Sequence, residues 1–487
     1  MARVNALRIV FLTGAVALAA GCGGNGGSSG GLGADSASSI APASAPVLVS
    51  VTSDLDSEQW NTVEDLVEKF PGREQLLSEL RSSFTEEGID FEQDVKPALG
   101  ERVDLVLLDL ENQNDFIIVT KAKDQDKMDA LLEKGDDPPE HEVVDGWTVI
   151  ADEQATIDRF QQAAEGEALE DTEAFKQATE ELPDDTLATI FVNGRQATEA
   201  LKEELSESGA AGALQQQKLE WVGVALEAVS NGVRLEGAAK ASGTGEAIKN
   251  FTAKLLDDVP AGALAVVSFQ GKGGADQLRK QLEANPALQG QLAQMEQFLG
   301  TTLDEVAEIF NGEGVLYVRE ASPFPEVTLL LEQADPAQAV ATLDKVAARA
   351  GAFLGARPVA SSVDGIPVKN LTLGQVTITY GGFDGKLALT NVGSALGDLR
   401  EEGDKLADDP DFKAASETAG LPEESGGLVY VNLQEAIELG TRYAQLADGG
   451  DNIPPEVEAN ARPLQSFIMF ASQEGDESHF TGFLEIE

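Results

Sequence analysis

The apolar residues of this chain fall into short runs of the length that β-strands have. Two such runs, at residues 103–110 and 115–122, flank the turn-forming tetrapeptide "ENQN". Strands joined by so short a connection are antiparallel neighbours, so this segment predicts a β-hairpin. A second long hairpin is predicted for residues 221–241, where Asn231 and Gly232 form a favoured two-residue turn.

Helical periodicity appears between the predicted strands. Residues 126–133 and 337–349 have the spacing of amphipathic helices, and Pro71 and Pro286 each separate two helical stretches. Strands in hairpins together with separate helices predict an α+β fold, in which a mainly antiparallel sheet carries helices packed on one of its faces.

The same pattern occurs twice. The segment "LPDDTLATIFVN" at 182–193 returns as "LPEESGGLVYVN" at 421–432, and the segment that starts at Gly146 returns from Gly385 at the same offset. Nearer the N-terminus the offset is smaller, which implies an insertion in the second copy between residues 345 and 385. Repeats of this length predict two homologous lobes rather than a solenoid, and we expect each lobe to have its own mainly antiparallel sheet with helices packed on one face.

The domain boundaries follow from these repeats and from composition. We expect a signal peptide at 1–21, a modified Cys22 with a flexible Gly/Ser/Ala linker over 22–45, a first lobe at 46–240, a connector at 241–258 and a second lobe at 259–487. Each lobe is long enough to bury its own core.

The N-terminus has the form of an export signal. Arg3 and Arg8 precede the apolar run 9–20, which is too short to span a bilayer. The following "LAAGC" resembles the bacterial lipobox, although the family pattern more often has Leu where this chain has Ala19. The resemblance implies that Cys22 carries lipid such as palmitate and anchors the protein to the outer face of the cytoplasmic membrane. The alternative is an ordinary secretory signal followed by an unmodified cysteine.

Composition limits the chemistry and the partners. Cys22 is the single cysteine, so the exported part contains no intrachain disulfide. Removal of residues 1–21 takes away two of the 34 basic residues, which leaves 32 − 85 = −53 formal charges. A surface this acidic repels nucleic acid and anionic lipid headgroups, so we expect the only membrane contact to be the lipid anchor.

No catalytic pattern stands out. His141 and His479 have no second histidine at metal-ligand spacing, and we expect both to be surface or structural residues. Neither a nucleophile elbow nor a phosphate-binding loop is present, and the acidic clusters are typical of solvated loops and helix caps. We expect Trp60, Trp147 and Trp221 to lie in the core. The sequence therefore predicts no enzyme, no cofactor, and no catalytic or metal-binding residue.

A family resemblance supports the same picture. The segment "VKPALGERVDLVLL", the repeated "LP" strands and the lipobox resemble DUF3352, an uncharacterised family of exported bacterial proteins. Phe91, Val95, Pro97, Leu99 and Gly100 fit one family motif; a second is fitted by Leu182, Pro183, Asp185 and Leu187. The resemblance implies a location and a fold, and it brings no catalytic residues.

Three function classes remain open. The first is a non-catalytic envelope lipoprotein that binds a protein or polymer partner or has a structural role. The second is a carrier of a lipid or other hydrophobic ligand, which requires an apolar groove on a curved sheet. The third, a hydrolase with a dispersed site, has the least support in the sequence.

Overall fold

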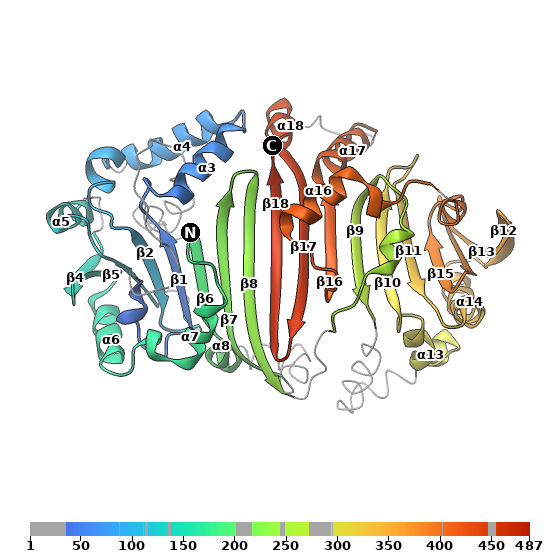
Figure 1. Cartoon of the computed structure of the whole chain (residues 1–487), viewed down its shortest axis with the longest axis horizontal. Coiled ribbons are helices and arrows are strands. Elements are labelled where there is room, and N and C mark those ends of the chain that lie inside the picture. The colour runs from blue at the N-terminus through green and yellow to red at the C-terminus, as the bar shows by residue number, and fades with distance from the viewer. Residues whose placement is uncertain are drawn as a thin grey trace. The chain divides into compact units, whose positions relative to one another are not determined.

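The structure is a computed structural model in which helices are interspersed among antiparallel strands (Figure 1). It describes residues 36–86, 88–110, 112, 115–134, 138–200, 217–243, 249–271, 294, 296–401, 403–446 and 454–487. The eighteen strands in these ranges are assigned to one sheet, in which each residue-by-residue pairing is antiparallel. The predicted α+β class with a mainly antiparallel sheet is confirmed. The expectation of one separate sheet in each lobe is wrong, because the strands form a single sheet.

The chain divides into two compact units. Unit 1 contains residues 1–245, 454–464 and 474–487, and unit 2 contains residues 246–453 and 465–473. The final strand of the chain thus belongs to unit 1, although its sequence position lies beyond unit 2. The signal segment 1–21, Cys22 and the proline at position 286 lie outside the described residues.

The strands of unit 1 follow the order β4-β5-β3-β2-β1-β6-β7-β8-β18, each paired with its neighbour. Their bounds are β1 (Val47–Thr52), β2 (Arg102–Leu107), β3 (Phe116–Thr120), β4 (Glu140–Val144), β5 (Trp147–Ala151), β6 (Ala188–Asn193), β7 (Gln217–Val229), β8 (Gly232–Gly243) and β18 (Glu477–Ile486). Both predicted hairpins are confirmed as β2–β3 and β7–β8.

The helices of unit 1 lie between these strands in the chain. They are α3 (Glu58–Glu68), α4 (Arg73–Glu86), α5 (Gln125–Leu132), α6 (Gln154–Ala164), α7 (Glu173–Glu180) and α8 (Gly194–Ala200). Short turns add the 3₁₀ segments η1 (Ala37–Ser39) and η3 (Leu169–Asp171) and the π-helical turn η2 (Phe91–Val95). As predicted, Pro71 lies between two helices, α3 and α4, because its ring prevents one continuous helix.

Helices cover both faces of the sheet in unit 1. Ile117 and Val119 belong to a core with Phe160 of α6, whereas the intervening Ile118 belongs to a different core with Met128 of α5. Consecutive strand residues point to opposite faces, so the two cores lie on opposite sides of the sheet. The expectation of helices on one face only is therefore wrong, because this strand is apolar on both sides.

Residues 36–45 are part of the folded body. Ala37, Ala41 and Ala45 are buried in the core that contains Phe160, and Pro42 forms a bridge with Ala168. The expected flexible linker over 22–45 is therefore corrected for its last ten residues. Small side chains, which suggested flexibility by composition, are the ones that fit closely against a packed surface.

The strands of unit 2 follow the order β12-β13-β14-β15-β11-β10-β9-β16-β17. Their bounds are β9 (Ala263–Gln270), β10 (Glu313–Arg319), β11 (Glu326–Glu332), β12 (Val359–Val363), β13 (Ile366–Leu373), β14 (Val376–Phe383), β15 (Lys386–Thr390), β16 (Gly427–Asn432) and β17 (Leu464–Glu474). Hairpins β12–β13 and β14–β15 turn at Asp364-Gly365 and Asp384-Gly385, whose positive φ values suit a two-residue turn. Strands β12, β13 and β14 lie in the segment between residues 345 and 385 that the repeat offset marked as an insertion.

The helices of unit 2 also lie on both faces. They are α13 (Leu303–Glu308), α14 (Pro336–Phe353), α15 (Ala395–Asp398), α16 (Pro410–Ala419) and α17 (Leu433–Leu446), with the 3₁₀ segments η4 (Lys254–Asp257) and η5 (Leu406–Asp408). A further helix, α18 (Pro455–Ala461), belongs to unit 1. Ala339 of α14 packs on Leu331 of β11, whereas Phe412 of α16 packs edge-on against Tyr430 of β16 on the other face.

Candidate functional site

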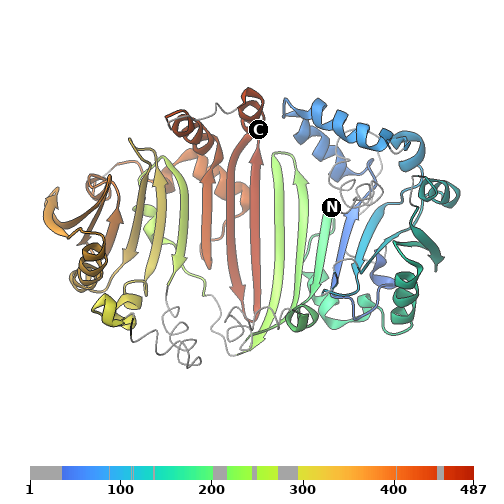
Figure 2. The same ribbon diagram turned by 180° about the vertical axis from the view of Figure 1, so that it is seen from behind.

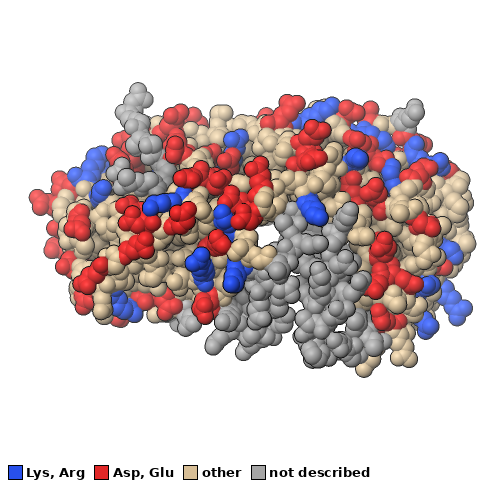
Figure 3. Space-filling view, turned by 60° about the horizontal axis from the view of Figure 1, so that its bottom comes forward, with Lys and Arg blue, Asp and Glu red and all other residues tan. Residues whose placement is uncertain are grey.

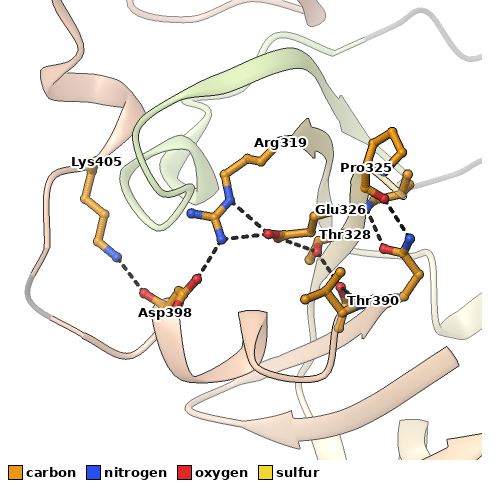
Figure 4. Close-up of polar contacts among 10 residues, drawn as sticks. Arg319, Pro325, Glu326, Thr328, Thr390, Asp398 and Lys405 are labelled. Carbon is orange, nitrogen blue, oxygen red and sulfur yellow. Dashed lines mark hydrogen bonds and ion pairs between the residues drawn. The ribbon is translucent and has the colours of Figure 1, made fainter. Parts of the chain in front are cut away.

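A network of polar side chains in unit 2 is the first candidate site (Figure 4). Arg319, the last residue of β10, donates from Nε and Nη2 to Oε2 of Glu326 at 3.0 and 2.7 Å. Its Nη2 also donates to Asp398 at 2.7 Å. Glu326 is 2% exposed, and its second oxygen accepts a bond from the hydroxyl of Thr328 at 2.9 Å.

The contacts of this network are all within the protein. Thr328 is also 2.8 Å from the hydroxyl of Thr390, and Asn391 accepts from the backbone of Val327 and donates to the carbonyl of Pro325, both at 2.7 Å. The buried Glu326 carboxylate is thus paired and hydrogen-bonded, as a buried charge must be. The network joins β10, β11 and β15 to α15, and we interpret it as structural.

A cavity in unit 1 is the second candidate. Its volume is about 450 Å³, and we call it the basic pocket. It is lined by Ser53, Asp54, Leu55, Asp56, Phe91, Lys96, Leu99, Gly100, Glu101, Arg102, Lys121, Lys123 and Trp147. Four of these thirteen residues are cationic and three are acidic, whereas the whole chain has 34 basic and 85 acidic residues.

The wall of the basic pocket combines an aromatic ring with positive charge. Trp147 at the start of β5 is 3% exposed, and the ammonium group of Lys121 lies 4.5 Å from the centre of its ring. Arg102 at the start of β2 is 6% exposed, and its Nε donates to Ser50 at 2.8 Å. Lys96 lies 3.4 Å from Asp56, which is a partly exposed ion pair.

Gly100 lets the backbone approach closely at this pocket. A Cβ atom at this position would lie 1.8 Å from the carbonyl oxygen of Lys121, so only glycine, which has no Cβ atom, fits here without a clash. Phe91, Leu99 and Gly100 are among the residues on which the family resemblance rests, and all three line the cavity. The sequence motif thus describes one wall of the basic pocket.

Unit 2 has a cavity at the corresponding ends of β10 and β11. Its volume is about 690 Å³, and we call it the acidic pocket. Five carboxylates and no cation are among its lining residues, which are Asp304, Glu305, Glu308, Ile309, Asn311, Gly312, Glu332, Gln333, Ala334, Asp335, Gln338, Ala339 and Thr342. Within the described ranges, no group of three or more possible ligands has the geometry of a metal site.

Each unit also contains a buried carboxylate on the strand that comes second in chain order, which is β2 in unit 1 and β10 in unit 2. Asp104 of β2 is fully buried and accepts hydrogen bonds from the backbone amide of Ala37 and the hydroxyl of Ser50. Burial raises the pKa of Asp104, while the bond from Ser50 and the charge of Arg102 act in the opposite direction. In unit 2, Glu313 accepts from the amide of Leu255 at 2.6 Å, and burial raises its pKa as well.

One face of the sheet in unit 2 carries apolar side chains that are partly exposed. Val267, Leu316 and Met469 are 37%, 36% and 37% exposed. Register places Val267 opposite Leu316 and also opposite Val429, which in turn lies opposite Met469. We call these four residues the apolar row. On the other face of the same strands, Val266 and Tyr317 are fully buried.

A similar alternation occurs in unit 1. Val49 lies opposite Ile190 of β6, and Ile190 lies opposite Val224 of β7. Ile190 is 36% exposed, whereas its neighbour Phe191 is fully buried. Figure 2 shows the green strands β7 and β8 from behind; near the end of β7, Ala228 packs in one core with Trp60 of α3.

The residues singled out by the sequence are dispersed. His141 lies in β4, with Nε2 3.8 Å from Asp129, and His479 lies in β18, with Nδ1 3.9 Å from Glu181. The three tryptophans are buried, as predicted; Trp147 also lines the basic pocket. Cys22 lies outside the described residues, and among the helices within them none is long and apolar enough to cross a membrane.

Sequence reasoning missed the basic pocket and the apolar row. The four cations of the pocket come from three segments that are separated by acidic residues, so no local run of basic residues marked them. The apolar row was visible as short apolar runs, but alternation cannot tell which face of a strand is exposed.

Comparisons with known proteins give a family without a known activity. The model of DUF3352, described as a protein of unknown function, matches residues 4–144 and 134–486. Crystal forms IV and I of TP0453 are each 11% identical to this chain, with a TM-score of 0.25. Both matches cover 47% of this chain; they cover 79% of the chain in form IV and 78% of the chain in form I. Form III is 10% identical, with a TM-score of 0.24, and the match covers 47% of this chain and 93% of the TP0453 chain. Scores this low carry no argument about fold or function, and no curated protein matches the chain. The family model spans almost the whole sequence, which confirms the resemblance: the chain belongs to the DUF3352 family of proteins of unknown function.

Proposed function

We propose that this protein is a non-catalytic binding module of the cell envelope, anchored through lipid on Cys22, and that the apolar row of unit 2 docks a protein partner. The observation that carries the proposal is the exposure of Val267, Leu316 and Met469 at 36–37% on paired strands. Where one face of an antiparallel sheet contacts water, the side chains on that face are normally polar. Contiguous exposed apolar side chains are typical of interaction surfaces.

Charge supports a neutral or basic protein as the partner. The exported chain has a formal charge of −53, and acidic side chains outnumber basic ones over the surface seen in Figure 3. Anionic headgroups and nucleic acid are repelled by such a surface. A partner with an apolar strip and basic flanks would be attracted to the same surface, and this attraction would weaken as salt increases.

In-cell photo-crosslinking tests the docking surface. A photoreactive amino acid at Leu316 should give one adduct of defined mass, because this side chain is 36% exposed at one end of the row. The matched control is the same amino acid at the exposed Asp304 of α13, which should give no such adduct. Changing Val267 to Asp on the paired strand should abolish the adduct at position 316. An adduct of equal yield at position 304, or none at 316, contradicts the proposal.

A carrier of hydrophobic ligands is the alternative outcome. Native mass spectrometry of the purified chain would then show a lipid or other apolar small molecule retained by the protein. The charged residues in the walls of the two pockets, four cations and three acids in the basic pocket and five acids in the acidic pocket, disfavour a purely apolar ligand there. Hydrophobic ligands are held by mainly apolar cavities.

The lipid anchor is a separate part of the proposal. A Cys22→Ala change, or treatment with globomycin, should leave the signal uncut and the chain without its lipid. Membrane fractionation with metabolic labelling by palmitate checks this, and an unchanged labelled membrane fraction in the Cys22→Ala variant would contradict the anchor. Because residues 36–45 are packed into unit 1, the proposed tether is limited to residues 23–35.

We further infer that the two units are copies of one ancestral lobe. In support, the order β5-β3-β2-β1-β6-β7 in unit 1 has the same pairing pattern as β15-β11-β10-β9-β16-β17 in unit 2. Strands β6 and β16 also lie in segments of repeated sequence. An experimental structure in which these six pairs of strands did not superpose would refute the inference.

A further inference from the structure

The basic pocket concentrates positive charge in a chain that is otherwise acidic. Lys96 follows the π-helical turn η2, Arg102 begins β2, and Lys121 and Lys123 follow β3. Three segments between residues 96 and 123 therefore deliver cations to one cavity. Like charges repel each other, so collecting them in one place has an energetic cost that an anionic ligand would offset.

The charge is specific to unit 1 and not a property of this fold position. Arg102 and Glu313 are the first residues of β2 and β10. Thr120 pairs with the second residue of β2, and Leu331 pairs with the second residue of β10. Lys121 and Glu332 directly follow these two residues, so they occupy equivalent positions in the two units. Both positions have opposite charges in the two units, and the acidic pocket has no cation.

The net charge of the chain does not prevent an anion from binding here. Charges exposed to water are screened beyond roughly 8–10 Å at ordinary ionic strength. The groups nearest to a ligand in the pocket are the four cations and the acids Asp54, Asp56 and Glu101, of which Asp56 is paired with Lys96. Cations therefore outnumber acids by one among the lining residues, and the buried Asp104 offsets part of the charge of Arg102.

The shape and lining indicate the class of ligand. Trp147, Leu99, Phe91 and Leu55 provide apolar surface, and the ammonium group of Lys121 lies directly over the ring of Trp147. A cavity of about 450 Å³ is within the range for small organic molecules. Several cations that converge from different segments suit a dianion with three oxygens better than a monoanion with two.

We propose that the basic pocket of unit 1 binds a phosphate monoester that carries an apolar group, with the phosphate near Arg102, Lys121 and Lys123 and the apolar group against Trp147. The proposal goes beyond the docking surface of unit 2 and stands or fails independently of it. The phosphate chemistry fits either a free metabolite or the headgroup of a lipid with a terminal phosphate.

Isothermal titration calorimetry of the full chain tests the proposal with four probes: phenyl phosphate, inorganic phosphate, benzoate and short-chain dihexanoyl phosphatidic acid below its micelle concentration. We expect phenyl phosphate to bind more tightly than inorganic phosphate and benzoate. Tighter binding of the phosphatidic acid than of phenyl phosphate would assign the ligand to lipid headgroups, and the reverse would assign it to free metabolites. Benzoate binding as tightly as phenyl phosphate would overturn the phosphate assignment.

Variants connect the binding to the pocket. Lys121→Gln with Lys123→Gln changes two exposed side chains and should weaken phenyl phosphate binding at least about tenfold, since each lost bond to a charged group has roughly that effect. The matched control, Lys127→Gln with Lys176→Gln, removes the same charge from exposed positions outside the pocket and should change Kd less than about twofold. Equal weakening in the two variants, or no saturable binding of either organic phosphate, would overturn the proposal.

Discussion

The buried carboxylate of Asp104 gives the sharpest test of the packing in unit 1. We consider Asp104→Asn, which keeps the shape of the side chain and an oxygen that can accept from the amide of Ala37, but removes the negative charge. Because burial raises the pKa of Asp104 in the folded protein, the folded chain holds this proton to a higher pH than the unfolded chain does. The stabilisation that this group contributes is complete below the unfolded aspartate pKa of about 3.9 and is lost as pH rises through the folded pKa.

The difference in unfolding free energy between Asp104→Asn and the wild type should therefore shift in favour of the variant as pH rises. Its slope cannot exceed about 1.4 kcal/mol per pH unit, because a single proton is involved. Asp104→Ala should instead be destabilised by roughly 2–6 kcal/mol, since it leaves the amide of Ala37 and the hydroxyl of Ser50 buried without their acceptor, at about 1–3 kcal/mol each.

Urea unfolding followed by tryptophan fluorescence from pH 4 to pH 9 is the appropriate assay. Trp60, Trp147 and Trp221 are the three tryptophans of the chain and all belong to unit 1, so their fluorescence reports on the unit that contains Asp104. The exposed Asp126→Asn is the control and should change stability by less than about 0.5 kcal/mol. A flat difference curve for Asp104→Asn across this range would refute the reasoning.

Two further predictions concern close packing and the buried ion pair. Gly100→Ala should lower the stability of unit 1 by about 3 kcal/mol or more, because its Cβ would lie 1.8 Å from the carbonyl oxygen of Lys121. The control Gly166→Ala, whose Cβ would have its nearest contact at 3.5 Å, should be nearly neutral. Equal urea midpoints for the two variants would contradict this prediction. Arg319→Met should destabilise unit 2 by roughly 3–5 kcal/mol in urea unfolding followed by circular dichroism, because it leaves the charge of Glu326 buried without its partner. Adding Glu326→Gln should recover more than half of that loss, and no recovery would show that the cost has another origin.

Local sequence signals predicted the elements and failed for their packing. The Asn231-Gly232 turn and the proline at position 71 act within a few residues, and both had the predicted effect. The run "FIIV" at 116–119 has no polar alternation, which is typical of a strand buried on both faces. This run was the available signal that helices would cover both sides of the sheet.

Features that depend on distant segments could not be predicted. Residues 36–45 are buried against segments far along the chain: Ala37 shares a core with Phe160, and its amide donates to Asp104. The basic pocket depends on the register that brings Lys121 next to Arg102. Composition describes only the average of a segment, whereas both features arise from pairs of positions that meet after folding.

The place of β18 in unit 1 has a consequence for synthesis of the chain. Nine residues of β18, from Glu477 to Glu485, pair with β8, so the outer edge of β8 has no native partner until the last part of the chain has emerged. An unpaired edge of that length is a template for adding strands from other nascent copies. A ribosome that stops before Glu477 would release a chain whose first unit is unfinished and prone to aggregate. The pairing of β8 within unit 1 is thus complete only once β18 has been added.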